Sequence, residues 1–213
     1  MEKIRILCFG DSNTWGQEPG LSGKRYDTSI RYTSLLQDNL GDEFKVIDEG
    51  QCSRTLFAPN FKYPKGDRCG LTFFAPMICS HDPLDYVVIY LGTNDMKEAY
   101  NLKVKDLATV LEEKYINFLR NELAPHLSKL PKIIIVAPSV IYDERWIGEN
   151  IFLGAQEKSY AFNETYRQVA EKTGCLFVSN EDILSGSDGI HLAPQSHAVL
   201  AQKLHQVIIN DRK

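Results

Sequence analysis

The stretch IRILCFGDSN, residues 4–13, decides the fold. Its first part, Ile4 to Phe9, is a short run rich in Ile and Leu without clean alternation, as expected of a strand covered on both faces. Gly10 ends this run, and the polar residues that follow turn the chain out of the strand. A buried strand that ends in a tight polar turn predicts an α/β fold with a helix beginning at the turn.

Similar apolar runs recur along the chain and alternate with longer stretches of helical periodicity. The further runs are Phe44 to Ile47, Tyr86 to Leu91, Ile133 to Ala137 and Cys175 to Val178. The helical stretches are marked by Leu107, Leu111, Tyr115 and Phe118, and by Leu200, Leu204, Val207 and Ile208, with Pro194 in the first turn of the last helix. This alternation predicts parallel strands joined by right-handed crossovers, in a three-layer α/β/α sandwich.

Two segments show little periodicity. Residues 53–83 and 138–154 are long, and the first is rich in Pro and Gly. We expect both to be loop-rich excursions that can wall a binding pocket.

Composition limits the classes of ligand. The 213 residues, 43% of them hydrophobic, suffice for one substantial core, so we expect a single domain over residues 1–213. The 24 Lys and Arg and the 28 Asp and Glu give a net charge of -4 without long runs of either sign, which argues against nucleic acid or anionic lipid as partners. A small neutral or moderately polar ligand is favoured.

The chain carries no signs of secretion or of membrane insertion. Its N-terminal apolar run is too short for a secretory signal, and no segment approaches the roughly 18 apolar residues of a membrane helix. The five cysteines are an odd set without CxxC spacing, which argues against a disulfide framework and a zinc ribbon. We therefore expect a soluble cytoplasmic protein.

Polar clusters follow several of the predicted strands. These are residues 10–13, 50–55 and 92–95, and the segment 188–191 before the last helix can reach the same edge. Because parallel strands end at one edge of a sheet, where ligands usually bind, we expect the four clusters to lie together.

Ser12 is the candidate nucleophile of this edge. A serine hydroxyl attacks only when a base removes its proton, and a third group must hold that base in the right tautomer. Gly10 would relieve crowding at a tight strand-to-helix turn that presents the hydroxyl. Asp11 and Ser12 also fit a simple helix cap without a catalytic role.

His191 is the candidate base, and Asp188 lies three residues before it, close enough to accept the Nδ1 proton of the imidazole. A chance surface turn would contain the same pair. The remaining histidines lack such a partner, and we expect them at the surface or at an interface. They are His81, His126, His197 and His205.

Asn94 is a candidate oxyanion donor, because it follows a buried strand and offers a side-chain amide. A turn-forming Asn would look the same. Trp15, Gly50 and Cys52 are candidates for the wall of the pocket. Trp15 could equally well fill a gap under the adjacent helix. Cys52 is better explained as a small apolar side chain in the packing than as a second nucleophile.

Taken together, these residues resemble the conserved blocks of the SGNH, or GDSL-type, serine hydrolases. The matching motifs are Gly10-Asp11-Ser12, Gly92-Thr93-Asn94-Asp95 and Asp188-Gly189-Ile190-His191, and the first extends as far as Gly16 in a way that resembles bacterial arylesterases and acyltransferases. The resemblance spans nearly the whole chain and implies a flavodoxin-like five-stranded parallel sheet.

The resemblance also implies the roles of the site residues. Ser12 would be the nucleophile, His191 the base and Asp188 its orienting partner, with Asn94 and the amide of Ser12 in the oxyanion hole. Ser53 stands where the family usually has a glycine, so its amide can serve only if Ser53 adopts the dihedral angles of that glycine.

The expected activity is hydrolysis of short acyl or aryl esters through an acyl-enzyme, without a metal or an organic cofactor. A carbohydrate acetylesterase, an acyl thioesterase and an acyltransferase use the same residues and stay open as alternatives. A catalytically silent binding module is the alternative outside enzymes. A homo-oligomer is also open, with the aromatic residues between Phe57 and Phe74 as candidates for contacts between subunits.

Overall fold

The computed structural model of the chain describes residues 2–60, 66–146, 148–149 and 151–213. Within them, a parallel sheet contains the strands β1 (Ile4–Gly10), β2 (Phe44–Gly50), β3 (Tyr86–Tyr90), β4 (Lys132–Val136) and β5 (Leu176–Val178). Their order in the sheet is β2-β1-β3-β4-β5, and every neighbouring pair is parallel. The predicted α/β sandwich with a five-stranded parallel sheet is confirmed.

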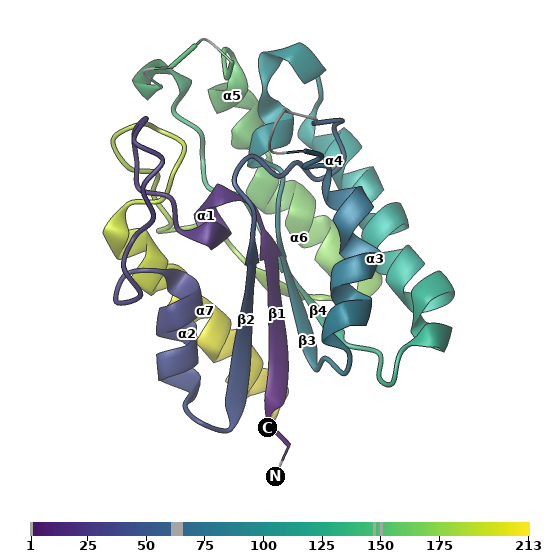
Figure 1. The fold of residues 1–213 in the computed structure, drawn as a ribbon. Helices are drawn as coiled ribbons and strands as arrows, with labels where there is room; N and C mark the ends of the chain where they lie inside the picture. The colour runs from purple at the N-terminus through teal and green to yellow at the C-terminus, as the bar shows by residue number, and fades with distance from the viewer. Residues whose placement is uncertain (1, 61–65, 147, 150) are drawn as a thin grey trace.

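Helices cover both faces of the sheet (Figure 1). The α-helices are α1 (Ser12–Trp15), α2 (Tyr32–Leu40), α3 (Gly70–His81), α4 (Val104–Val110), α5 (Ala155–Ser159), α6 (Phe162–Thr173) and α7 (Pro194–Asp211). The short 3₁₀ helices are η1 (Thr93–Met96), η2 (Glu98–Tyr100), η5 (Ala124–His126) and η6 (Asp143–Arg145). Two π-helical segments, η3 (Leu111–Asn117) and η4 (Leu119–Leu123), follow α4. α2 and α7 lie on one face of the sheet, and α3, α4 and α6 lie on the other.

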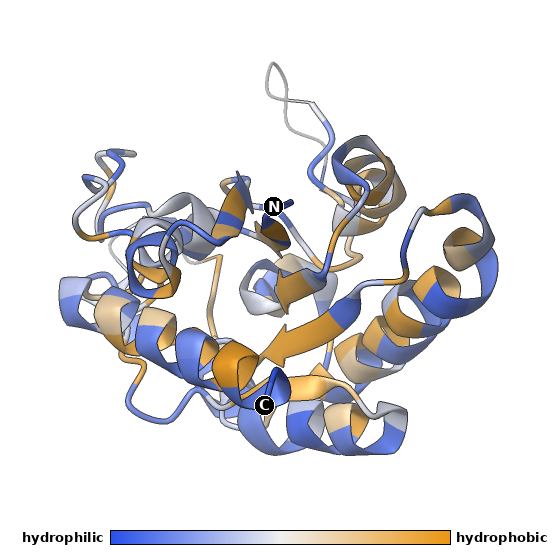
Figure 2. Cartoon of the chain, turned by 90° about the horizontal axis from the view of Figure 1, so that it is seen from below, coloured by the Kyte–Doolittle hydropathy of each residue, from blue (hydrophilic) through white to orange (hydrophobic). Residues whose placement is uncertain are grey.

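The core forms two apolar layers, one on each face of the sheet. Leu7 and Phe9 of β1 point into the layer under α3 and α4, whereas Ile6 and Cys8 point into the layer under α2 and α7. Side chains that alternate between two buried faces explain why the strand reads as an uninterrupted apolar run. Figure 2 shows the same arrangement as hydrophobic strands between helices that are hydrophilic on their outer sides.

The structure corrects two predictions about the segment 53–83. The segment contains the twelve-residue helix α3, although Pro76 lies inside it. Phe74 and Ile78, one turn apart on α3, are both 1% exposed, so burial in the core outweighs the unfavourable helix propensity of proline. Phe57 and Phe73 pack against the same core rather than forming an exposed aromatic surface. The aromatic residues at positions 61 and 63 lie outside the described residues.

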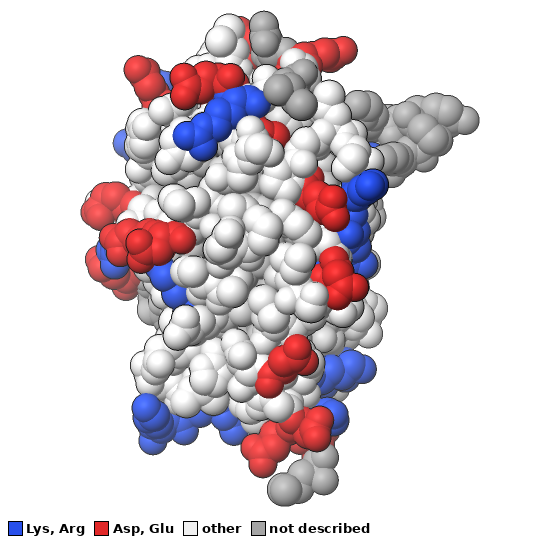
Figure 3. Space-filling view, turned by 90° about the vertical axis from the view of Figure 1, so that its left-hand side faces the viewer, with Lys and Arg blue, Asp and Glu red and all other residues white. Residues whose placement is uncertain are grey.

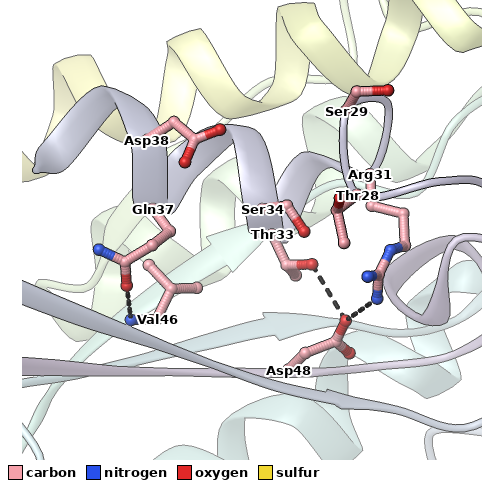
Figure 4. Close-up of a pocket in the computed structure, with 9 residues that line it drawn as sticks. All are labelled: Thr28, Ser29, Arg31, Thr33, Ser34, Gln37, Asp38, Val46 and Asp48. Atoms are coloured by element: carbon pink, nitrogen blue, oxygen red, sulfur yellow. Dashed lines mark hydrogen bonds and ion pairs between the residues drawn. The ribbon is translucent and has the colours of Figure 1, made fainter.

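The outer edge of the sheet, along β2, is capped by side chains (Figure 4). The Gln37 amide accepts from Val46 N at 2.8 Å and donates to Phe44 O at 3.2 Å. Asp48 binds Thr33 Oγ1 at 3.0 Å and pairs with Arg31 at 3.4 Å, beside an open polar hollow of about 530 Å³. Unpaired backbone groups at a sheet edge can pair with another chain, and the Gln37 side chain occupies those of Phe44 and Val46.

The surface that includes α2 and α7 shows no concentration of positive charge (Figure 3). Basic and acidic side chains are scattered around its margin, and its middle is uncharged. Among the residues that the structure describes, every helix falls short of the length and apolar character needed to cross a bilayer. The five cysteines, all within the described residues, form no disulfide.

The prediction that His197 lies at the surface or an interface is wrong. His197 is 0% exposed and stacks on Tyr32 with ring centroids 6.3 Å apart. Its Nδ1 accepts from the Tyr32 backbone N–H at 3.3 Å, which requires a neutral ring. Because α2 packs on α7, a histidine on the inner side of α7 is enclosed, and this could not be read from the spacing of histidines alone.

Burial of His197 gives a testable dependence of stability on pH. Burial, with a smaller contribution from the charge of His191, lowers the pKa of His197 from its ordinary value of 6.5 to about 4. The unfolded chain therefore binds the proton first, and the stabilising contribution, complete above pH 6.5, is lost as the pH falls through 4. We expect the contribution to the free energy of unfolding to shrink by roughly 2 to 3 kcal/mol between pH 7 and pH 4.5.

Urea unfolding of the wild type and of His197→Asn at both pH values measures this contribution. The pKa of Asp11 and of Asp95 is raised to about 6, chiefly by burial, and these carboxyls shift stability in the opposite direction. Both proteins carry them, so the difference between the two proteins isolates His197. An unchanged difference between pH 7 and pH 4.5 would show that the ring is not held neutral.

Candidate active site

The turn after β1 presents the Ser12 hydroxyl. Asp11 caps α1, because its Oδ1 accepts the Asn13 N–H at 2.9 Å. A Cβ on Gly10 would lie 1.9 Å from Thr14 Oγ1, so only glycine fits where the strand turns into the helix. The helix-cap interpretation thus holds for Asp11, whereas the Ser12 side chain takes no part in the cap and is directed elsewhere.

The second half of the site is the turn 188–191. Asp188 Oδ1 accepts the backbone N–H groups of Ile190 and His191, each at 2.9 Å, and Oδ2 lies 2.6 Å from His191 Nδ1. Gly189 has φ +74°, and a Cβ there would lie 2.1 Å from Tyr142 O. The carboxylate therefore shapes the turn and holds the imidazole within the same four residues.

The structure brings the two halves together. His191 Nε2 lies 3.1 Å from Ser12 Oγ, although the two residues are 179 positions apart. Because the Asp188 carboxylate can only accept, Nδ1 carries the proton of the neutral ring and Nε2 is left to accept from the Ser12 hydroxyl. Ser12 and His191 are each 5% exposed.

Asp188 is held as a carboxylate. Burial raises the pKa of Asp188, but the His191 ring and the backbone N–H groups of Gly20 and Ile190 lower it by more than burial raises it. The pKa therefore lies below its ordinary value. The Gly20 N–H donates to Oδ2 at 2.7 Å, from a loop far away in the sequence. The charge that orients the imidazole is therefore retained at neutral pH.

Ser53 and Asn94 lie beside the Ser12 hydroxyl. Ser53 has φ +68°, in the left-handed region that glycine prefers and that other residues rarely adopt. Asn94 Nδ2 donates to Arg54 O at 3.1 Å and has a longer contact of 3.4 Å with Asp11 Oδ2. Within the described part of the chain, the backbone N–H groups of Ser12 and Ser53 have no hydrogen-bond partner.

Asp95 joins the two loops that carry Ser53 and Asn94. Its carboxylate accepts three backbone N–H groups, from Leu56 at 2.6 Å and from Phe57 and Ala58 at 3.1 Å each. Burial raises the pKa of Asp95 to about 6, although these three bonds oppose the shift. Burial therefore makes the ionised form of Asp95 less favourable, but its three hydrogen bonds fix the loop 56–58 against η1.

Replacing Asp95 with asparagine is expected to destabilise the protein. An amide has only one oxygen, so at least one of the three buried N–H groups would face an NH₂ group and lose its acceptor. We expect a loss of roughly 1 to 3 kcal/mol in the free energy of unfolding, measured by urea denaturation. The exposed Asp42, changed to Asn, is the matched control and should be neutral; equal stabilities for the two variants would refute the bracing role.

A cavity of about 230 Å³ opens beside the Ser12 hydroxyl. Three groups of residues line it: Ser12, Ser53, Asn94 and His191; the polar residues Gln17, Asn60 and Lys97; and the apolar residues Trp146, Ile151, Phe152 and Ile190. The apolar wall comes mostly from the segment 138–154, and Asn60 comes from the segment 53–83, as expected for these excursions. The individual wall residues carried no motif that would have singled them out.

The pocket-wall predictions for Trp15, Gly50 and Cys52 do not agree with this lining, which contains none of the three among the described residues. Trp15 lies under the Arg25 guanidinium, 5.1 Å from its ring centroid. Gly50 packs against it, since a Cβ there would lie 2.1 Å from Trp15 N. Trp15 and Gly50 thus contribute to the close contact between α1 and β2.

Arg54 is a buried residue of the site to which the sequence assigned no role. This side chain is 4% exposed, lies over the Phe9 ring at 4.2 Å and donates to Gly10 O at 2.8 Å and to Glu49 O. It ties the ends of β1 and β2 together directly below Ser12. No group of three or more His, Cys, Asp or Glu side chains among the described residues is arranged to hold a metal ion.

Comparison with known proteins places this site in a family. A family model described as the GDSL-like Lipase/Acylhydrolase family matches residues 8–199. A carbohydrate acetylesterase from Sinorhizobium meliloti is 29% identical, with a TM-score of 0.87 over 98% of this chain and 99% of that chain. The aryl esterase of M. smegmatis is 29% identical, with a TM-score of 0.85 over 97% and 99%.

A lipase/acylhydrolase from Enterococcus faecalis, 17% identical with a TM-score of 0.68 over 96% of this chain and 95% of that chain, shares the fold. A search of curated proteins finds no match. The matched model covers both the end of the strand that leads to Ser12 and the turn that carries His191. The chain therefore belongs to the GDSL-like lipase/acylhydrolase family, and it is a carboxylic ester hydrolase.

Proposed function

We propose that the protein hydrolyses short acyl esters with Ser12 as nucleophile, His191 as general base and Asp188 as the group that orients the base. The observation that carries the proposal is the continuous relay from Asp188 Oδ2 to His191 Nδ1, at 2.6 Å, and from His191 Nε2 to Ser12 Oγ, at 3.1 Å. A hydroxyl, an imidazole and a buried carboxylate in this order are what nucleophilic acyl transfer requires.

The reaction proceeds in two steps. Ser12 Oγ attacks the acyl carbon while His191 Nε2 takes its proton, and the tetrahedral intermediate then expels the alcohol, which receives that proton. Water attacks the acyl-enzyme in the second step, giving its proton to His191 and releasing the acid and the Ser12 hydroxyl. Asp188 stays ionised and stabilises the imidazolium in both steps.

The developing oxyanion is stabilised by N–H donors of residues that line the cavity. The backbone N–H groups of Ser12 and Ser53 are two of them, and the Asn94 amide supplies the third. Asn94 Nδ2 donates to Arg54 O at 3.1 Å and to Asp11 Oδ2 at 3.4 Å, so the amide would give up the longer bond to Asp11 in order to donate to the substrate oxygen.

The cavity favours a short acyl group. Its volume of about 230 Å³ is below the roughly 300–1,000 Å³ typical of pockets for drug-sized ligands. Trp146 and Phe152, with ring centroids 5.7 Å apart, form an aromatic part of its wall. This supports acetyl and other short esters over the long acyl chains of a thioesterase substrate.

A panel of p-nitrophenyl esters from acetyl to dodecanoyl tests the proposed acyl length. We expect kcat/KM to be highest for acetyl or propionyl and to fall steeply beyond butyryl, because longer chains would meet the aromatic wall. A maximum at eight carbons or more would contradict the proposal. Ser12→Ala, run in parallel, gives the uncatalysed background for each ester.

Acetylated carbohydrate is the second candidate substrate. The rim residues Gln17, Asn60 and Lys97 are polar and suit a hydroxylated alcohol, and the similar Sinorhizobium meliloti structure is that of a carbohydrate acetylesterase. Release of acetate from acetylated xylan, compared with p-nitrophenyl acetate, distinguishes this alcohol from an aryl one. Transfer of the acyl group to an alcohol, in place of water, would appear as a new ester in the same assay.

We further propose that the protein acts in the cytoplasm as one domain over residues 1–213, with a small-molecule ester as substrate and without nucleic acid or membrane partners. Cysteines without disulfides support the compartment, and the scattered charges in Figure 3 support the choice of substrate. Homo-oligomerisation remains a separate proposal, for which light scattering is the test.

A further inference from the structure

The Asn13 side chain contacts the peptide groups on both sides of His191. Its Oδ1 accepts the Leu192 N–H at 2.9 Å, and its Nδ2 donates to Ile190 O at 3.4 Å. Because one partner can only donate and the other can only accept, the orientation of the amide is fixed by the contacts themselves. Asn13 is 1% exposed, so neither backbone group could exchange this partner for bulk water.

Asn13 is also the residue next to Ser12. Its own backbone N–H donates to Asp11 Oδ1 at 2.9 Å, which fixes the base of the side chain within the turn of the nucleophile. The path from the hydroxyl to the imidazole therefore runs through one peptide bond and one carboxamide. It joins two segments that lie 177 to 179 positions apart in the sequence.

The other attachments of the turn 188–191 come from segments that do not carry the nucleophile. Gly20 N donates to Asp188 at 2.7 Å, and Tyr142 N donates to Gly189 O at 2.9 Å. These contacts fix where the turn lies in the fold. Apart from the hydrogen bond of Ser12 to the imidazole, only the contacts of Asn13, among those of the described residues, hold the turn 188–191 directly against α1, the helix that begins at Ser12.

We propose that Asn13 is a positioning residue that sets the distance and angle between His191 Nε2 and Ser12 Oγ, an inference that rests on the proposed function of these two groups. Asp188 and His191 belong to the same turn, so loss of Asn13 leaves their mutual hydrogen bond intact and displaces them together. The rate of proton transfer from Ser12 falls. Most of the cavity wall lies outside this turn and keeps its place, and only Ile190 and His191 move with it.

Asn13→Leu tests the proposal, because leucine has a similar size and shape but neither donates nor accepts. We expect kcat for p-nitrophenyl acetate to fall roughly 10- to 100-fold, since a displacement of about 1 Å can cost that much. KM should stay within about twofold, because substrate binding does not depend on the relay. The rate of phosphonylation of Ser12 by a fluorophosphonate probe should fall by the same factor as kcat.

Gln37→Leu is the matched control. The Gln37 amide also accepts one backbone N–H and donates to backbone carbonyls, those of Gly41 and Phe44, at the edge of the sheet along β2 (Figure 4). Gln37 is not among the described residues that line the cavity. Its loss should lower the melting temperature without changing kcat. A merely structural role of Asn13 would give both variants the same pattern, and that result would overturn the proposal.

A double-mutant cycle tests whether Asn13 acts through His191. In the background of His191→Ala, the residual hydrolysis no longer uses the imidazole, so adding Asn13→Leu should cost little more. If the second substitution lowers the residual rate by the same factor as in the wild type, Asn13 acts by another route and the proposal is wrong.

Ser12→Ala, measured in the same series, separates this inference from the proposed function. If Ser12→Ala remains active, the proposed function fails; if it is inactive while Asn13→Leu has the wild-type kcat, only the role of Asn13 fails. Should Asn13→Leu not fold, Asn13→Asp keeps the acceptor for Leu192 N and replaces the donor to Ile190 O with a carboxylate oxygen. A wild-type kcat and labelling rate in Asn13→Asp would then contradict the proposal.

Discussion

Replacing Ser12 with alanine is expected to lower kcat for p-nitrophenyl acetate by roughly 10⁴- to 10⁶-fold while the protein remains folded. The hydroxyl is the only proposed nucleophile, and within the part of the chain that the structure describes its Oγ makes a hydrogen bond to His191 Nε2 and to no other group. Removing it therefore abolishes the acyl-enzyme route without disturbing the Asp11 cap that holds the turn.

Steady-state kinetics and a urea melt of the same preparation measure the two halves of this prediction. The exposed Ser22, changed to Ala, is the control and should leave kcat unchanged. Activity within tenfold of the wild type in Ser12→Ala would mean that another group attacks the ester, whatever the geometry of the relay.

Replacing Asp188 with asparagine is expected to lower kcat by roughly 10⁴-fold, because the imidazole would be held in the wrong tautomer. An asparagine that keeps the Oδ1 contacts to the Ile190 and His191 N–H groups places its NH₂ group at the Oδ2 position, opposite His191 Nδ1. The ring would then carry its proton on Nε2 and could not accept from Ser12. The same NH₂ group would also face the Gly20 N–H, so some stability should be lost as well.

The pH-rate profile of Asp188→Asn distinguishes orientation from simple unfolding. A folded variant should show a low kcat at every pH where the wild type is active, with KM little changed. Asp182→Asn, an exposed change in the same loop, is the control. A loss of less than tenfold in folded Asp188→Asn would show that the carboxylate does not set the tautomer.

The sheet was predictable because its strands are covered on both faces. Each buried run of Ile, Val and Leu marked a strand to within a few residues, and β2 was longer than predicted because Asp48, Glu49 and Gly50 pair with β1 despite their polarity. α3 was missed because Pro76 suggests a break, and the burial that stabilises this helix depends on partners distant in sequence.

The motif residues of the site were predictable for a related reason. Ser12 and Asn94 lie where the chain leaves the carboxyl edge of the sheet, and His191 lies in the loop that runs from that edge to α7, so topology brings the three together. Trp146, Ile151 and Phe152 were predictable only as a segment, because apolar residues in a long loop carry no periodicity that reveals which of them face the cavity. The φ angle of Ser53 required coordinates, since serine rarely adopts the left-handed region.

Covalent labelling with a fluorophosphonate probe, followed by mass spectrometry of the digested protein, tests the relay of Ser12, His191 and Asp188 most directly. The account predicts one adduct per chain, located on Ser12, that forms slowly in Asp188→Asn and is absent in Ser12→Ala. An adduct on another residue such as Cys52, or a folded protein that stays unlabelled while still hydrolysing esters, would contradict it.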